Sequence, residues 1–80
     1  MHDTFRKFIL TELLRSPNMK LKDDESLIRG GLIDSFSLVQ VGLFIEETWG
    51  FNVPDRDLTV DRMDTINQMV SYVEQRLNTK

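Results

Sequence analysis

The sequence predicts an all-α protein, a small bundle of three to four helices with a long loop between the first and second helices. Apolar residues recur at spacings of three and four in three separate stretches, which is the period of amphipathic helices. The apolar–polar alternation typical of strands is weak throughout. The length of 80 residues allows one modest hydrophobic core. We therefore expect residues 1–80 to form a single helical domain.

The first helix is predicted to begin near Asp3 or Thr4, because either side chain can cap a helix N-terminus. Its apolar face is made by Phe5, Phe8, Ile9 and Leu13. Ser-Pro-Asn at 16–18 ends it, since proline cannot continue a helix interior. Residues 17–33 then form a long loop. Four apolar residues are expected to hold this loop on the core, namely Leu21, Leu27, Ile28 and Leu32.

The second helix is predicted from Asp34 to Trp49, with Gly50 as its left-handed C-terminal stop. It has two apolar faces at about 100° per residue. The first, expected to face the core, consists of Leu38, Val41, Ile45, Thr48 and Trp49. The second consists of Phe36, Val39 and Leu43 and is flanked by Glu46 and Glu47. An exposed apolar strip rimmed by acids is typical of a docking surface, although the long loop folding over Phe36 and Val39 is the alternative. Phe44 fits neither face and is expected to pack on the first or last helix.

The remainder of the chain is predicted to contain a connector, a short turn and a last helix. Residues 51–54 form the extended connector, because the residue before Pro54 avoids helical angles. Residues 55–63 are expected to form one short helical turn that places Leu58, Val60 or Met63 inward. Thr65 and Gln68 match a capping box at the start of the last helix. The apolar stripe of that helix is Ile66, Met69, Val70, Val73 and Leu77.

Composition excludes several classes of function. The chain has no cysteine, and its only histidine is His2, so disulfides, thiolate metal sites and histidine-based catalysis are not expected. We expect no metal site, no catalytic residue and no enzymatic activity. The N-terminus has no signal-peptide pattern, and no apolar run is long enough to cross a membrane. The expectation is a cytoplasmic, monomeric protein without membrane insertion.

The net charge of −3 is unevenly distributed along the chain. Residues 1–33 hold six Lys/Arg and five Asp/Glu, whereas residues 34–64 hold two and seven. An acidic middle argues against binding to nucleic acid and favours basic protein partners.

Ser35, at the start of the second helix, allows two interpretations. Serine at this position is most often an N-cap. Asp34 can do the capping itself, however, which would leave the Ser35 hydroxyl free at a helix end that favours phosphate groups. No His, Cys or Lys lies near Ser35 in the sequence to activate it, so an external enzyme would have to modify it.

Three motifs stand out along the chain: Gly-Leu-Ile-Asp-Ser-Phe at 31–36, Ile-Glu-Glu-Thr-Trp-Gly at 45–50 and Phe-Asn-Val-Pro-Asp at 51–55. Together they resemble the acyl carrier proteins, and the resemblance covers nearly the whole chain. The resemblance implies that a phosphopantetheinyl transferase attaches 4'-phosphopantetheine from coenzyme A to Ser35, and that Asp34 helps place the transferase's magnesium. The arm's thiol would carry an acyl group as a thioester for fatty-acid, polyketide or related specialised lipid biosynthesis.

The resemblance also implies how partner enzymes dock. Enzymes with basic docking patches would contact Phe36, Val39 and Leu43 as the apolar residues, and Glu46 and Glu47 as the charged ones. The inward face would form a cleft for an acyl chain, lined by Leu38, Val41, Ile45 and Val53.

Several residues depart from the family pattern, and two functions other than lipid carriage stay open. Phe36 replaces the usual leucine, and Lys20, Lys22 and Arg29 make the first loop basic, which favours a specialised carrier. Ile-Asp-Ser-Phe at 33–36 is similar to D-alanyl carrier proteins, which carry an amino acid on the same arm. The alternative from another class is an unmodified helical protein-interaction module that uses the Phe36–Val39–Leu43 strip.

Overall fold

The computed structural model describes residues 1–78, and these residues form helices and no strand. The α-helices are α1 (His2–Phe8), α2 (Ser37–Trp49), α3 (Val60–Met63) and α4 (Ile66–Asn78). A π-helical turn, η1 (Ile9–Leu13), continues α1, and a 3₁₀ turn, η2 (Asp55–Asp57), precedes α3. The all-α prediction is confirmed. Residues 79–80 of the predicted 1–80 domain lie outside the described residues.

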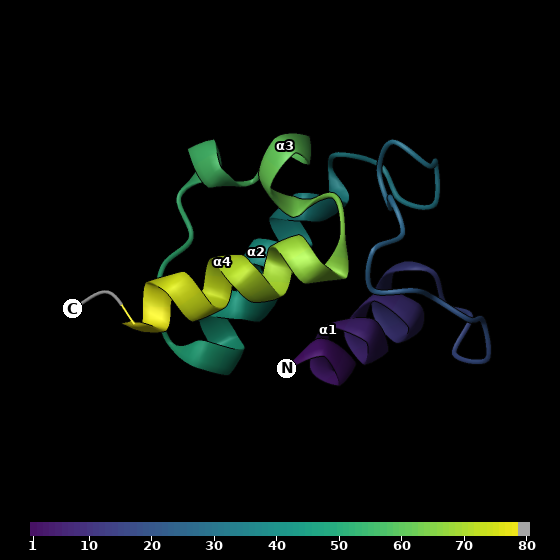
Figure 1. Ribbon diagram of the computed structural model, residues 1–80, viewed down its shortest axis with the longest axis horizontal. Helices are drawn as coiled ribbons and strands as arrows, with labels where there is room; N and C mark the ends of the chain where they lie inside the picture. The colour runs from purple at the N-terminus through teal and green to yellow at the C-terminus, as the bar shows by residue number, and fades with distance from the viewer. Residues whose placement is uncertain (79–80) are drawn as a thin grey trace.

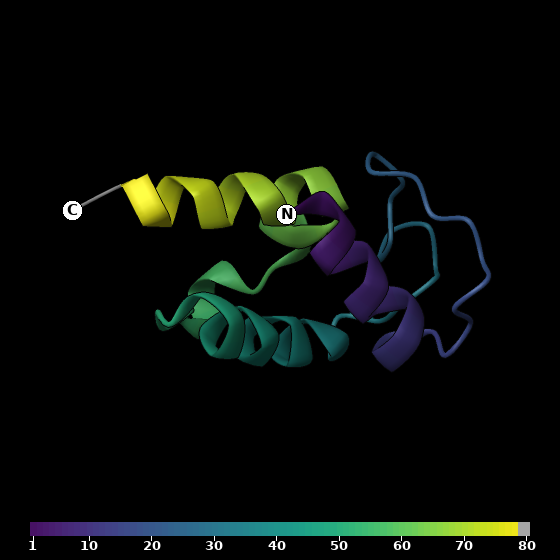
Figure 2. The same cartoon turned by 90° about the horizontal axis from the view of Figure 1, so that it is seen from below.

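The core lies between α2 and α4. Figure 2 shows these two helices on opposite sides of the molecule, with α1 crossing obliquely near one end, and Figure 1 shows the loop after α1 occupying that end. Fully buried side chains come from every long element and from the loop: Phe5, Ile9, Leu27, Leu38, Val41, Ile45, Met63, Ile66, Met69 and Val73. None of the helices in residues 1–78 is long and apolar enough to span a bilayer.

Helix α1 begins earlier and ends earlier than predicted. It starts at His2, one residue before Asp3, and its N-cap Met1 makes no side-chain cap hydrogen bond, so the prediction that Asp3 or Thr4 caps the helix is wrong. At the other end, the amide of Leu14 donates to the carbonyl of Ile9 at 2.8 Å in a widened π turn. Arg15 then has φ 52°, a left-handed conformation that ends the helix before Pro17 is reached.

The regular part of α2 begins at Ser37, three residues after the predicted start at Asp34. Residues 34–36 instead form a tighter turn. The amides of Ser37, Leu38 and Val39 each donate to the carbonyl three residues earlier, at 3.1–3.2 Å. The predicted C-terminal stop is confirmed, because Gly50 has φ 78°.

The two predicted faces of α2 are present. Leu38, Val41 and Ile45 are buried, but Thr48 is exposed, because it lies about 60° around the helix from Ile45 at the edge of that face. Phe36, Val39 and Leu43 are 82%, 55% and 53% exposed. The alternative in which the loop covers Phe36 and Val39 is therefore wrong.

Helix α2 packs closely on α1 and on the segment before α3. The ring of Phe44 stacks on Phe8 with centroids 4.2 Å apart, which places Phe44 against the first helix. Gly42 is buried, and a Cβ built on it would lie 3.1 Å from both methyl groups of Leu58. The glycine thus lets Leu58 approach the helix backbone.

The capping box of α4 is confirmed by its reciprocal hydrogen bonds. The amide of Gln68 donates to Thr65 Oγ1 at 3.0 Å, and the amide of Thr65 donates to Gln68 Oε1 at 3.1 Å. In the apolar stripe of this helix, Ile66, Met69, Val70 and Val73 are buried. Leu77 is 39% exposed, because α4 extends beyond the core there. In the 55–63 segment, Met63 is buried, whereas Leu58 and Val60 are half-buried.

Candidate functional site

Ser35 is exposed in the tight turn that leads into α2. Its carbonyl accepts from the amide of Leu38 at 3.2 Å, as expected for this turn. Its hydroxyl, by contrast, makes no hydrogen bond to any residue from 1 to 78. A second protein can therefore reach this oxygen without breaking a contact of the native structure.

The carboxylate of Asp34 caps the turn in place of Ser35. Asp34 Oδ1 accepts from the amide of Ser37 at 3.1 Å and lies 3.3 Å from the Ser37 hydroxyl, which donates to it. Asp34 Oδ2 has no hydrogen-bond partner among the described residues. One carboxylate oxygen thus fixes the turn, and the other is free for a ligand.

The start of α2 keeps unpaired hydrogen-bond donors. The amides of Asp34, Ser35 and Phe36 donate to nothing within the described part of the chain. Such amides, together with the positive end of the helix dipole, favour a negatively charged group. A phosphate ester on Ser35 would lie beside them.

A hollow of about 620 Å³ opens beside Ser35. Leu13 borders it from the end of η1, Ile28 and Leu32 border it from the loop, and Asp34 and Ser35 border it from the turn before α2. These three apolar side chains are only half-buried, so they offer apolar surface at the base of the site.

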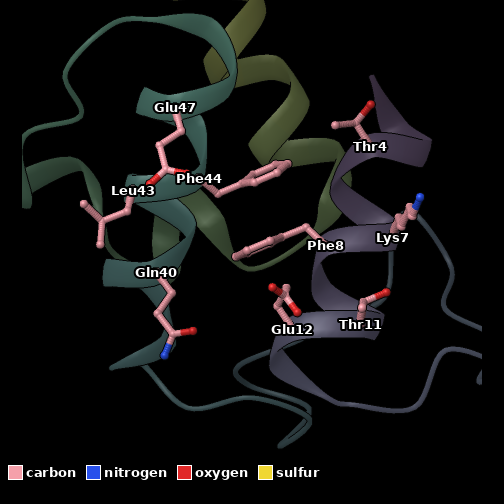
Figure 3. Close-up of a pocket in the computed structure, with 9 residues that line it drawn as sticks. All are labelled: Thr4, Lys7, Phe8, Thr11, Glu12, Gln40, Leu43, Phe44 and Glu47. Atoms are coloured by element: carbon pink, nitrogen blue, oxygen red, sulfur yellow. The ribbon is translucent and has the colours of Figure 1, made fainter.

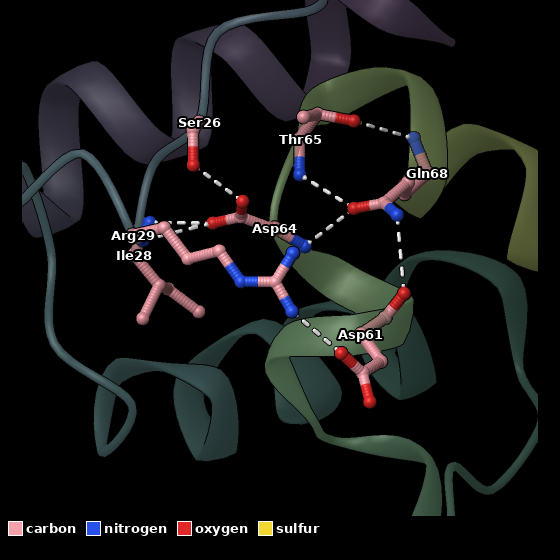
Figure 4. A network of polar contacts seen from close by, with 7 residues as sticks. All are labelled: Ser26, Ile28, Arg29, Asp61, Asp64, Thr65 and Gln68. Carbon is pink, nitrogen blue, oxygen red and sulfur yellow. Dashed lines mark hydrogen bonds and ion pairs between the residues drawn. The ribbon is translucent and has the colours of Figure 1, made fainter.

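The buried carboxylate of Asp64 holds the part of the loop that contains Ser26, Ile28 and Arg29 (Figure 4). It accepts from the hydroxyl of Ser26 and from the amides of Ile28 and Arg29, the latter two at 2.8 and 3.2 Å. The Asp64 carbonyl also accepts from the amide of Leu27 at 2.7 Å. The loop is thereby tied to the corner between α3 and α4.

The hydrogen bonds to Asp64 outweigh the cost of burying its charge. Burial by itself raises the pKa of this carboxyl. The bonds from Ser26, Ile28 and Arg29, helped by the positive charge of Arg29, lower the pKa below its ordinary value. Asp64 is therefore ionised at neutral pH.

Sequence reasoning missed this anchor. Asp64 directly precedes the capping-box threonine, and an acidic residue next to a helix cap is ordinarily expected to be exposed to solvent. Its burial depends on Ser26, which is 38 residues away in the sequence. Only the spatial arrangement of the loop reveals it.

A second hollow, of about 740 Å³, lies between α1 and α2 (Figure 3). The stacked rings of Phe8 and Phe44 lie within it, and Leu43 borders it on the side of the exposed strip. Glu12 lines it from η1, and Glu47 lines it from α2.

The predicted cleft on the inward face is not open. All four of its predicted lining residues are packed in the core: Leu38, Val41, Ile45 and Val53. Their side chains fill the space between the helices because the core of so short a chain is small. The two hollows described above are lined by other residues.

The predicted partner contacts differ in exposure. Phe36, Val39, Leu43 and Glu47 are exposed. Glu46 is half-buried, and its Oε1 accepts from Asn52 Nδ2 at 3.0 Å. The apolar strip and Glu47 are thus free on the surface, whereas Glu46 also supports the connector after α2.

Curated relatives of the chain are small carrier proteins. A D-alanyl carrier protein from Lacticaseibacillus casei is 33% identical over 67 residues, which cover 84% of this chain and 83% of the relative. One from Abiotrophia defectiva is 29% identical over 69 residues, which cover 86% and 87%. No family model matches the chain, and no solved structure matches it.

Proposed function

Because the chain belongs to the acyl carrier protein family, and its curated relatives are named D-alanyl carrier proteins, we propose that it carries a D-alanyl group on a phosphopantetheine arm joined to Ser35. The observation that supports this most directly is the exposed Ser35 hydroxyl, which makes no hydrogen bond within residues 1–78. The unpaired amides at the start of α2 suit the phosphate of the arm.

The attachment reaction requires a second enzyme. Ser35 Oγ would form a phosphodiester bond while the bond between the two phosphates of coenzyme A breaks. Adenosine 3',5'-bisphosphate would leave, and the serine proton would pass to a base of the transferase. Asp34 fits this step, because its Oδ2 has no partner in the described residues and can face the transferase's magnesium.

When bound, the arm supplies the thiol that this cysteine-free chain lacks, and the thiol holds the carboxyl of D-alanine as a thioester. The chain's own part is to present that cargo. We propose that partner enzymes with basic patches contact the exposed strip of Phe36, Val39 and Leu43, with Glu46 and Glu47 providing charge complementarity.

A small amino acid is favoured over a fatty acyl or polyketide chain as cargo. The names of the relatives favour D-alanine. The closed core agrees, because Leu38, Val41 and Ile45 are packed against other described residues and leave no open cleft on the inward face of α2 for a long apolar chain. A D-alanyl group carries a charged ammonium and gains nothing from such a cleft.

Loading the holo-protein tests the cargo. The protein bearing the arm is incubated with ATP, D-alanine and a D-alanine-activating ligase, and in parallel with a fatty acid and an acyl-carrier ligase. We expect one D-alanyl adduct by intact mass, removable by hydroxylamine, and little fatty acyl adduct. Loading with the fatty acid alone would contradict the D-alanyl assignment.

A further inference from the structure

We propose that the hollow beside Ser35 is the resting seat of the first part of the phosphopantetheine arm. The arm would then fold toward η1 and the loop, and not lie along the exposed strip of α2. This inference rests on the proposed function, because it needs an arm on Ser35.

The position of the hollow is the first reason. Ser35 itself borders it, so an arm that starts at Ser35 Oγ starts at its rim. Its volume of about 620 Å³ lies within the range of small-molecule sites, about 300–1,000 Å³. The inward side of α2 offers no comparable seat, because Val41 and Ile45 are fully buried there.

The lining of the hollow matches the chemistry of the arm. The arm has a dimethyl-substituted carbon close to its phosphate, followed by two amide groups. The half-buried side chains of Leu13, Ile28 and Leu32 can cover the dimethyl group. The amides of Asp34 and Ser35 make no hydrogen bond within residues 1–78 and can donate to the phosphate or to the first amide carbonyl.

Gly31 keeps one side of this hollow open. Its φ of 81° is a conformation that favours glycine, and a Cβ built on it would meet no atom within 4 Å. The space beside it is therefore unfilled by the protein. The bonds from Ser26 and Ile28 to Asp64 hold the preceding part of the loop in place, so the hollow exists before any arm is attached.

Methyl NMR of the protein with and without the arm tests the proposal. Intact mass first establishes whether the arm is on Ser35. We expect methyl shifts at Leu13, Ile28 and Leu32 well above those at Val39 and Leu43, with nuclear Overhauser contacts to the arm's dimethyl group. An arm that is attached but contacts only Phe36 and Val39, or nothing, would overturn this inference and leave the proposed function standing. A wild-type chain that accepts no arm would overturn both.

A pair of matched variants sharpens the test. Leu32→Gln places a polar group in the hollow, and Leu77→Gln makes the same change at an exposed leucine of α4, outside both the hollow and the proposed docking strip. Both should still accept the arm, but the contacts of the dimethyl group should disappear only in Leu32→Gln. Leu13→Gln approaches the hollow from η1 and replaces Leu32→Gln if that variant does not fold. Equal contacts in all variants would contradict the proposal.

Discussion

Asp34 and Ser35 divide two tasks between neighbouring residues at the start of α2. A single serine could cap the turn or carry a group, but the same hydroxyl oxygen cannot remain free while it caps. Here Asp34 Oδ1 takes the amide of Ser37, and the Ser35 hydroxyl stays unbonded within the described residues. The dipeptide thus separates the stability of the turn from the chemistry proposed for it.

Substitutions at Asp34 should distinguish its two roles. Asp34→Ala should lower the free energy of unfolding by about 1 kcal/mol, because the cap is lost. Asp34→Asn should retain most of that stability, since an asparagine oxygen also caps. Both should slow attachment of the arm, because neither has a carboxylate for magnesium. Urea unfolding and transferase rates measure the two effects, and Asp34→Asn with a wild-type rate would refute the role in placing magnesium.

The ends of helices were predictable where the residues that cause them lie close together in the sequence. Thr65 and Gln68 lie three residues apart and satisfy each other, and Gly50 adopts the left-handed angle that glycine favours. The start of α2 was displaced because residues 34–36 form a turn with i→i+3 hydrogen bonds, which is frequent at the N-termini of α-helices. The end of α1 was displaced because Arg15 adopts a left-handed angle that its residue type does not announce.

The capping box gives a prediction for α4. Thr65→Ala should lower the free energy of unfolding by about 1 kcal/mol, because the amide of Gln68 loses its acceptor. Thr65→Ser should keep most of the stability, since it retains the hydroxyl. Thermal unfolding followed by circular dichroism measures both. Equal losses in the two variants would mean that the Thr65 methyl group, and not its hydroxyl, stabilises the helix start.

At the scale of the whole molecule, the long loop is the part that the sequence predicted least. Its apolar anchors, Leu21 and Leu27, were expected and are buried. Its polar anchor, Asp64, was not expected, because the burial of this acid depends on hydrogen-bond donors that lie far away in the sequence. The candidate site shows the same division: Ser35 was proposed from its motif, whereas the hollow beside it depends on where Asp64 holds the loop.

The anchor predicts a pH dependence of stability. Because the folded pKa of Asp64 is below its unfolded value, its contribution is fully present above the unfolded pKa of about 4 and is lost as pH falls through the folded pKa. Asp64→Asn should therefore be less stable than wild type at pH 7, with the difference narrowing in acid. Urea unfolding across pH 2–7, a range of roughly five units around that pKa, measures this. A constant difference would mean that the Asp64 charge does not contribute.

The most direct measurement of the carrier assignment compares two nearby serines. The wild type, Ser35→Ala and Ser37→Ala are incubated with coenzyme A, magnesium and a promiscuous phosphopantetheinyl transferase, and their intact masses are recorded. We predict one phosphopantetheine on the wild type and on Ser37→Ala, and none on Ser35→Ala. Ser35→Ala should change stability by less than about 0.5 kcal/mol, because its hydroxyl is exposed and makes no bond within residues 1–78. An unmodified wild type, or a modified and folded Ser35→Ala, would contradict the account.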